Sequence, residues 1–210
     1  MKKQLSITQK MLAFILVLFG AAACISETET PLAEQSQVES AELEEGGENL
    51  KKGGYIPYEE SFVNQITPFN LGTAESPLIF LPGTGEGKGQ GMGKVYSFIN
   101  QVATSPTTSE GAPVTQFHEE ALAAFGLTDI PDDVHSVTVS ENGTAIFYSG
   151  ETNIATFPDE NGRVEFEAVV HIVGGTKKFK NAKGEGKLTG SYHAGTGQGT
   201  SKIEALIQLN

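Results

Sequence analysis

Residues 174–190 read GGTKKFKNAKGEGKLTG and directly follow an alternating apolar run, Arg163–Val173. Two adjacent glycines at the end of a strand allow a positive φ and a sharp chain reversal that a side chain would penalise. Phe179 and Ala182 can turn inward over the end of a core, while the lysines around them point to water. The stretch therefore predicts a structural turn between two strands, built on Gly174–Gly175 and Phe179.

The spacing Gly-Gly-x-x-x-Phe-x-x-Ala-x-Gly, which begins at Gly174, resembles the signature of the allene oxide cyclase and dirigent barrels and of the bacterial barrels grouped with them. The resemblance covers residues 134–209 best and 78–102 more weakly, and it does not reach the N-terminus or residues 104–133. It implies a single antiparallel, calycin-like β-barrel. Members of this family cyclise an oxylipin, steer radical coupling or bind ligands that are not known. The plant enzymes' functional positions lie outside the shared motif, so we carry no catalytic residue over to this chain.

The alternation of apolar and polar residues predicts the strands of this barrel. In Arg163–Val173 the even-numbered residues are apolar and charged or polar residues share the opposite face, and residues 202–209 repeat the pattern. Asn142-Gly143 between two β-rich runs is a strong hairpin signal. Alternation with one wet face is typical of an antiparallel barrel. We therefore expect an all-β domain over residues 55–210.

One short helix is expected inside a long insertion, residues 104–133. Thr115 is placed to cap this helix at its N-terminus. Phe117, Ala121, Ala124 and Phe125 form one apolar stripe. The insertion can either close one end of the barrel as a lid or pack against the outside of the wall, and the sequence leaves both alternatives open.

The first 23 residues predict an export signal. A positively charged head precedes the apolar run Met11–Phe19, which is too short for a transmembrane helix, and small residues then lead to Cys24. This arrangement resembles a bacterial lipoprotein signal, in which cleavage before Cys24 leaves a lipidated N-terminus. Ordinary cleavage after Ala23 is the alternative. The chain has a single cysteine, which cannot form an internal disulfide, and lipid attachment gives it a use.

Residues 24–54 are expected to form an acidic, disordered tether. The segment contains eight glutamates and has no basic residue before Lys51, so it cannot bury enough apolar surface to offset the entropy of ordering. An acidic run after the cysteine also resembles the surface-export signal of Bacteroidetes lipoproteins. We therefore expect an exported protein, lipid-anchored to the cell envelope at the outer membrane, with exposure at the cell surface as an open alternative.

Charge and motif spacing exclude several other classes of function. A net charge of −12 disfavours binding to nucleic acid. Glycine occupies every second position of Gly83–Gly93, an offset that cannot supply a nucleotide-binding loop and that instead indicates an extended segment with one bare face. The four histidines are far apart in the sequence and no Gly-x-Ser-x-Gly is present. No metal, cofactor or catalytic residue is predicted.

These patterns favour a barrel that binds a small apolar molecule, because an eight-stranded barrel is wide enough to hold one such ligand. Two alternatives remain. One is a cyclase or isomerase, which needs a buried carboxylate or tyrosine, and the other is a structural or adhesion module without a pocket. The oligomeric state is left open. The aromatic and apolar residues expected to line the cavity are Tyr96, Phe98, Phe147, Phe166 and Val170.

Overall fold

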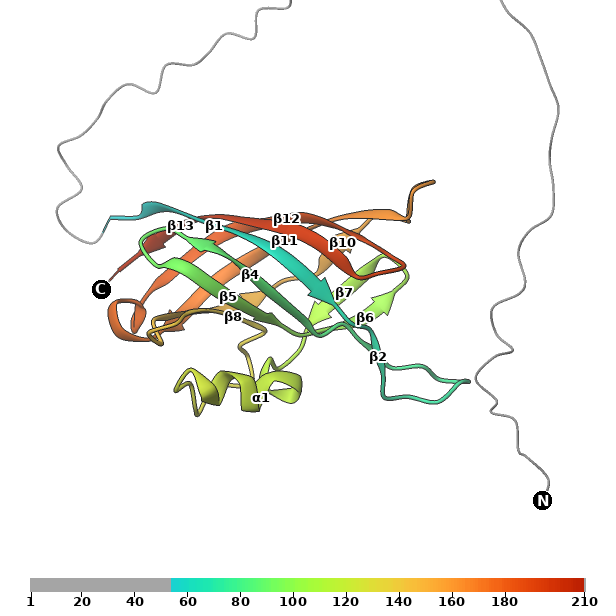
Figure 1. The fold of residues 1–210 in the computed structure, drawn as a ribbon, viewed down its shortest axis with the longest axis horizontal. Coiled ribbons are helices and arrows are strands. Elements are labelled where there is room, and N and C mark those ends of the chain that lie inside the picture. Colours follow the sequence, from blue (N-terminus) through green and yellow to red (C-terminus); the bar gives the residue numbers. More distant parts are fainter. Residues whose placement is uncertain (1–53, 210) are drawn as a thin grey trace, which may run out of the picture. The chain divides into compact units, whose positions relative to one another are not determined.

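The computed structural model describes residues 54–209, so the predicted signal peptide, Cys24 and the tether up to residue 53 lie outside the described residues. Within this part the chain forms thirteen strands, one α-helix and one 3₁₀ helix (Figure 1). None of its helices is both long and apolar enough to cross a membrane. In chain order the elements are β1 (Ile56–Ile66), β2 (Phe69–Asn70), β3 (Ile79–Phe80), β4 (Gly83–Gly89), β5 (Gly93–Ile99), β6 (Gln101–Ser105), β7 (Thr108–Gly111), α1 (Thr115–Ala124), β8 (Ser136–Ser140), β9 (Ala145–Gly150), β10 (Asn153–Ala155), β11 (Arg163–Gly175), η2 (Lys177–Phe179), β12 (Lys183–His193) and β13 (Gln198–Gln208).

Eight of these strands close into an antiparallel barrel. Around the wall the order is β1, β4, β5, β8, β9, β11, β12 and β13, and β13 pairs with β1 to complete the ring. The expected hairpin at Asn142-Gly143 joins β8 to β9, and Gly143 has a φ of 77°. The all-β class and the single closed antiparallel barrel predicted from the sequence are confirmed.

One half of the barrel interior is filled by side chains. Phe179 closes this end, since it is 2% exposed and its ring lies 6.0 Å from that of Tyr58. The alternation predicted for Arg163–Val173 places Val170 and Ile172 in this core. The buried members of the cluster are Tyr58, Ile146, Tyr148, Val170, Ile172, Phe179, Ala182, Ile203, Ala205 and Ile207.

The turn after β11 uses its two glycines for different reasons. Gly174 has a φ of 149°, and the register between β11 and β9 shifts between Ile172 and Gly174. Gly175 does not adopt a positive φ, which corrects the expectation of a left-handed conformation there. A Cβ on Gly175 would instead lie 2.1 Å from the backbone oxygen of Ala145. Close approach of two strands therefore excludes a side chain at Gly175.

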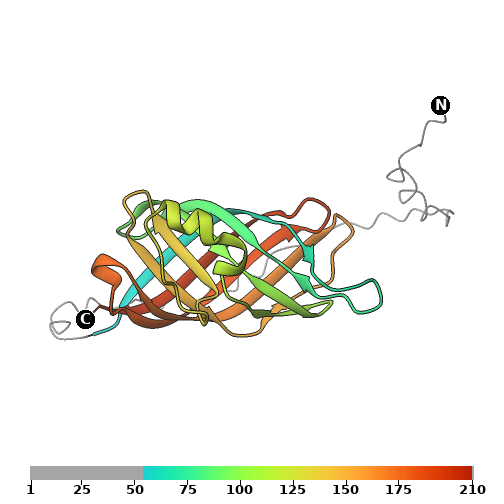
Figure 2. The same ribbon diagram turned by 90° about the horizontal axis from the view of Figure 1, so that it is seen from below.

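Helix α1 packs on the outside of the barrel, over the wall formed by β5, β8 and β9 (Figures 1 and 2). Val114 occupies the N-cap position and no side chain caps the helix, so the capping role expected for Thr115 is wrong. The buried helix residues are His118 and Leu122. Of the stripe predicted from the sequence, Ala121 and Phe125 also pack against the core beneath the helix and Phe117 contacts Phe69, whereas Ala124 is exposed.

A hairpin widens the other half of the barrel. Strand pairing is interrupted at Asn100, between β5 and β6, and at residues 151–152, between β9 and β10. These two interruptions leave one gap in the wall at this end of the barrel. The β6–β7 hairpin enters this gap, because β7 pairs with β10 and β10 pairs with β11. On its other side β6 pairs with β3, which pairs with β2. This half of the barrel contains the pocket described below.

Candidate functional site

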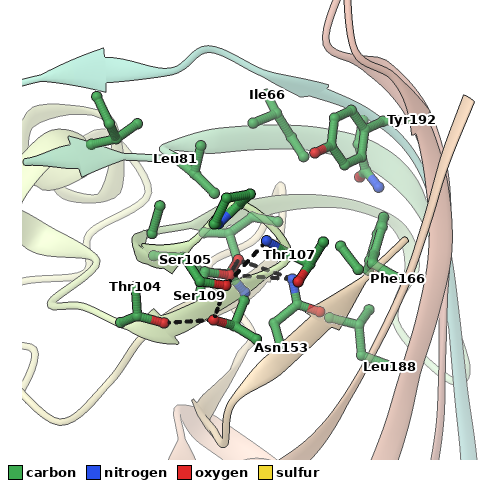
Figure 3. A pocket seen from close by; sticks show the side chains of 18 of the residues that line it. Ile66, Leu81, Thr104, Ser105, Thr107, Ser109, Asn153, Phe166, Leu188 and Tyr192 are labelled. Atoms are coloured by element: carbon green, nitrogen blue, oxygen red, sulfur yellow. Dashed lines mark hydrogen bonds between the residues drawn. The ribbon is translucent and has the colours of Figure 1, made fainter. Parts of the chain in front are cut away.

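A pocket of about 510 Å³ lies inside the widened half of the barrel. Residues from β1, β3, β5, β6, β7, β10, β11 and β12 line it, so it is built by segments far apart in the sequence (Figure 3). Its volume falls within the range of about 300–1,000 Å³ that is typical of small-molecule sites. The shape and size therefore suit a ligand much larger than water.

One side of the pocket is an apolar wall. Phe166 of β11 and Tyr192 of β12 have their ring centroids 6.1 Å apart, and Leu188 lies beside them (Figure 3). Gly190 of β12 makes room for this arrangement, since a Cβ there would lie 2.5 Å from the Phe166 ring. Burial raises the pKa of the Tyr192 phenol above its ordinary value, so this hydroxyl is neutral at physiological pH.

The opposite side is a polar ridge made by the β6–β7 hairpin and Asn153. Ser109 Oγ donates to Gln101 Oε1 at 2.9 Å. Asn153 Nδ2 donates more weakly to Gln101 Oε1 at 3.3 Å and to Ser109 Oγ at 3.4 Å (Figure 3). Asn153 Oδ1 is buried and accepts no hydrogen bond from the described residues. Thr104 and Thr108 continue the ridge, with their hydroxyl oxygens 2.9 Å apart.

No charged side chain lines the pocket. Its lining consists of aliphatic and aromatic residues, prolines, hydroxyl residues and amides, with no Asp, Glu, Lys, Arg or His. This absence is notable in a chain whose net charge is −12. Within residues 54–209, no group of three or more His, Cys, Asp or Glu side chains is placed to hold a metal ion.

A buried carboxylate lies in the filled half of the barrel. Glu60 of β1 is 1% exposed, and its carboxylate accepts hydrogen bonds from Tyr58 Oη at 2.6 Å and from Thr138 Oγ1 at 2.8 Å. Burial raises the pKa of Glu60 to about 7, and these hydrogen bonds oppose that shift. The fully buried Tyr148 phenol lies beside the same carboxylate but outside hydrogen-bond geometry. Burial, and then the Glu60 charge, raise the pKa of Tyr148.

A much smaller cavity of about 20 Å³ adjoins the pocket. It shares Ile99, Gln101 and Leu188 with the pocket, and it is also lined by Tyr148 and Val170. A cavity of this size can hold a single water. Glu60 itself does not line the pocket.

The residues predicted to line a cavity fall in three different places. Phe166 lines the pocket, and Val170 lines the small cavity. Tyr96, Phe98 and Phe147 pack on the outer wall under α1, so their expected interior position is wrong. Phe98 and Phe125 of the helix insertion have ring centroids 6.0 Å apart.

The error has a physical reason. β5 and β9 are apolar on both faces because α1 covers their outer side, so alternation cannot show which face points inward. The interior residues of β9 are Ile146 and Tyr148, which join the core of the filled half. From β5, Ile99 lines the pocket.

Sequence reasoning missed Glu60. A signal was present, because Glu60 shares its face of β1 with Tyr58, Phe62 and Asn64, all of which are buried. A carboxylate within an alternating apolar face is a candidate for a buried, hydrogen-bonded group. Cys24, predicted to carry lipid, lies outside the described residues.

Comparison with known proteins finds no matching family model, no matching curated protein and no matching solved structure. The resemblance of the 174–190 motif to the allene oxide cyclase and dirigent barrels therefore stays a prediction. The closed barrel, its pocket and its buried carboxylate are the observations on which a function is argued.

Proposed function

We propose that this protein binds a small, largely apolar molecule in the pocket of the widened half of the barrel. The observation that carries the proposal is the pocket itself: about 510 Å³, walled by Phe166, Leu188 and Tyr192, and free of charged side chains. The free energy falls when an apolar ligand replaces water against the apolar surface of a concave site. An open interior also argues against a purely structural or adhesive module, for which a filled core would suffice.

We propose further that the barrel is exported and anchored to the outer membrane through a lipid on Cys24. The support is the sequence of the first 54 residues: a short apolar run that ends at the only cysteine, followed by an acidic segment. In this arrangement the membrane is the partner of the N-terminus, and the pocket serves a molecule of the envelope or its surroundings. Membership of the allene oxide cyclase and dirigent barrels is part of the proposal, and the closed antiparallel barrel is compatible with it.

A binding assay with an uncharged dye tests the proposal. We expect Nile red to bind the full chain with a saturable rise in fluorescence, and Phe166→Ala to weaken binding at least about fivefold, because truncating a large apolar side chain loses of the order of 1 kcal/mol or more. Phe147→Ala is the matched control, since this residue is also a phenylalanine but packs on the outer wall. Equal binding by both variants and the wild type, or no saturable binding at all, refutes the proposal.

A cyclase or isomerase is the second candidate function, and Glu60 is the observation that favours it. A carboxylate with a pKa near 7 is suited to general acid–base chemistry at neutral pH. Glu60 lines neither the pocket nor the small cavity, so its carboxylate has no direct contact with a ligand in the pocket. Candidate substrates found by the dye assay can be incubated with wild type and Glu60→Gln. Turnover that Glu60→Gln abolishes while ligand affinity is retained favours an enzyme.

A further inference from the structure

We infer that the ligand is an uncharged, largely apolar molecule that carries a hydroxyl group, which hydrogen-bonds to Asn153 and Gln101. The inference rests on the proposed binding function and adds the chemical class of the ligand. It is carried by two features of the pocket that are independent of its size. The first is the absence of charged side chains from the lining. The second is that the polar ridge contains hydrogen-bonding groups without a partner among residues 54–209.

The uncharged lining selects against acids and amines. An ionised carboxylate that enters the pocket gives up its hydration and finds no cation to replace it. A protonated amine likewise finds no carboxylate. A neutral ligand loses only the weaker hydration of its polar group, which the ridge can replace with hydrogen bonds.

The ridge offers one acceptor and one donor. Gln101 Oε1 already accepts from Ser109 and Asn153, whereas Gln101 Nε2 donates to no atom of residues 54–209. Asn153 Nδ2 is already used, whereas Asn153 Oδ1 has no partner among these residues. A hydroxyl is the smallest group that donates and accepts at once. An ether or a carboxylate can only accept.

The match to a hydroxyl does not depend on the orientation of the two amides. If both are turned over, Gln101 donates to Ser109 and Asn153, and the free groups become Gln101 Oε1 and Asn153 Nδ2. The ridge then still presents one acceptor and one donor. Turning only one amide would bring two NH₂ groups or two carbonyl oxygens of Gln101 and Asn153 together, and the hydrogen bond between the two side chains would be lost.

Asn153 can turn to meet a ligand. Its free oxygen is shielded from solvent, so a hydroxyl reaches it only when the side chain rotates. The two hydrogen bonds that hold its nitrogen are long, at 3.3 and 3.4 Å, and resist rotation weakly. Rotation breaks these two long contacts, and the ligand hydroxyl offsets their loss by pairing a buried acceptor that otherwise has no partner among residues 54–209. The apolar body of the ligand then lies against Phe166, Leu188 and Tyr192.

Competition between three ligands with alkyl chains of similar length tests the inference. Dodecyl alcohol, methyl dodecyl ether and dodecanoate are titrated against Nile red bound to the full chain at neutral pH. We expect the alcohol to bind roughly five- to tenfold more tightly than the ether, as one net hydrogen bond predicts. Dodecanoate should bind at least about tenfold more weakly than the alcohol, because its charge is not compensated.

Two variants then locate the hydroxyl. Asn153→Leu should reduce the preference for alcohol over ether to less than about twofold, since the acceptor is gone. Phe166→Ala should lower the affinity for both the alcohol and the ether and leave the ratio of the two affinities unchanged. Equal affinity of the wild type for alcohol and ether, tighter binding of dodecanoate, or a preference that survives Asn153→Leu overturns the inference while the binding function stands. If Nile red and all three ligands fail to bind, the proposed function falls and the inference with it.

Discussion

Tyr58 Oη donates a 2.6 Å hydrogen bond to Glu60 Oε1, and the two side chains lie two residues apart on the interior face of β1. This pair, with Thr138 and Tyr148, places a polar group in the centre of an otherwise apolar core. A buried carboxylate is tolerated only where hydrogen bonds or a raised pKa reduce its cost. Both occur here, so the stability of the fold must depend on pH through Glu60.

The first prediction is that Glu60 makes the folded barrel less stable as the pH rises. Its pKa is about 7 in the folded protein and 4.5 ordinarily, so over this interval the folded chain holds a proton that the unfolded chain has lost. The stabilising contribution is complete below about pH 4.5 and lost above about pH 7, a fall of roughly 3 kcal/mol. Urea unfolding of wild type and Glu60→Gln across this range measures it. A difference in unfolding free energy between the two proteins that does not change with pH contradicts the prediction.

Removing the hydroxyl of Tyr58 should weaken the fold most where Glu60 is ionised. A hydrogen bond to a charged acceptor contributes about 1.5–3 kcal/mol, so we expect Tyr58→Phe to lower the free energy of unfolding by that amount above pH 7. Below about pH 5 the loss should be smaller. Tyr192→Phe is the matched control, because its hydroxyl bonds to no atom of residues 54–209 and its removal should cost less than about 0.5 kcal/mol. Equal losses in the two variants would show that the 2.6 Å contact has no special role.

The alternation of apolar and polar residues predicted which face of a strand points inward only for strands whose outer face carries charged residues. Along β11, Glu165, Glu167 and His171 mark the outside, so the inward position of Phe166 and Val170 followed from the sequence. The same reasoning failed for Tyr96, Phe98 and Phe147. Their strands have two apolar faces, one turned to the core and one to α1.

The site was only partly predictable for a related reason. The alternating glycines of β4 predicted one bare face, but β4 contributes no residue to the pocket, whereas β12 contributes Leu188 and Tyr192. The polar ridge and Glu60 depend on which strands become neighbours. Asn153 meets Gln101 only because the β6–β7 hairpin enters the wall beside β10. Such long-range pairing cannot be deduced from local patterns.

The two glycines after β11 should respond differently to alanine. Gly175→Ala places a Cβ about 2.1 Å from the Ala145 backbone oxygen, a contact that requires the strands to separate. Gly174→Ala meets nothing closer than 3.7 Å and strains only the backbone, at a φ of 149°. We expect both to lower the thermal midpoint, Gly175→Ala more, and Gly175→Val most. Lys178→Ala, on the exposed side of the turn, should change stability by less than about 1 kcal/mol. A Gly175→Ala variant as stable as wild type contradicts the close approach of these strands.

Cys24 should carry the membrane anchor. In a bacterial host with lipoprotein processing, we expect wild type to partition with membranes and to show the added mass of its acyl groups by mass spectrometry. Cys24→Ser should release the protein into the soluble fraction, because the apolar run Met11–Phe19 is too short to span the bilayer. If Cys24→Ser stays membrane-bound and unchanged in mass, lipidation at this position is wrong.

Filling the pocket should abolish binding without unfolding the barrel. Leu188 contributes to the pocket wall and to the small cavity beneath it, so a larger side chain there can extend into empty volume instead of into packed neighbours. We expect Leu188→Phe to keep its free energy of unfolding within about 1 kcal/mol of wild type, because a void is filled and no core contact is removed. Nile red affinity should fall by about tenfold or more. Leu206→Phe is the matched control, since Leu206 is 54% exposed on the outer face of β13 and its enlargement leaves the pocket untouched. Retained binding by a folded Leu188→Phe protein would place the ligand somewhere other than the widened half of the barrel.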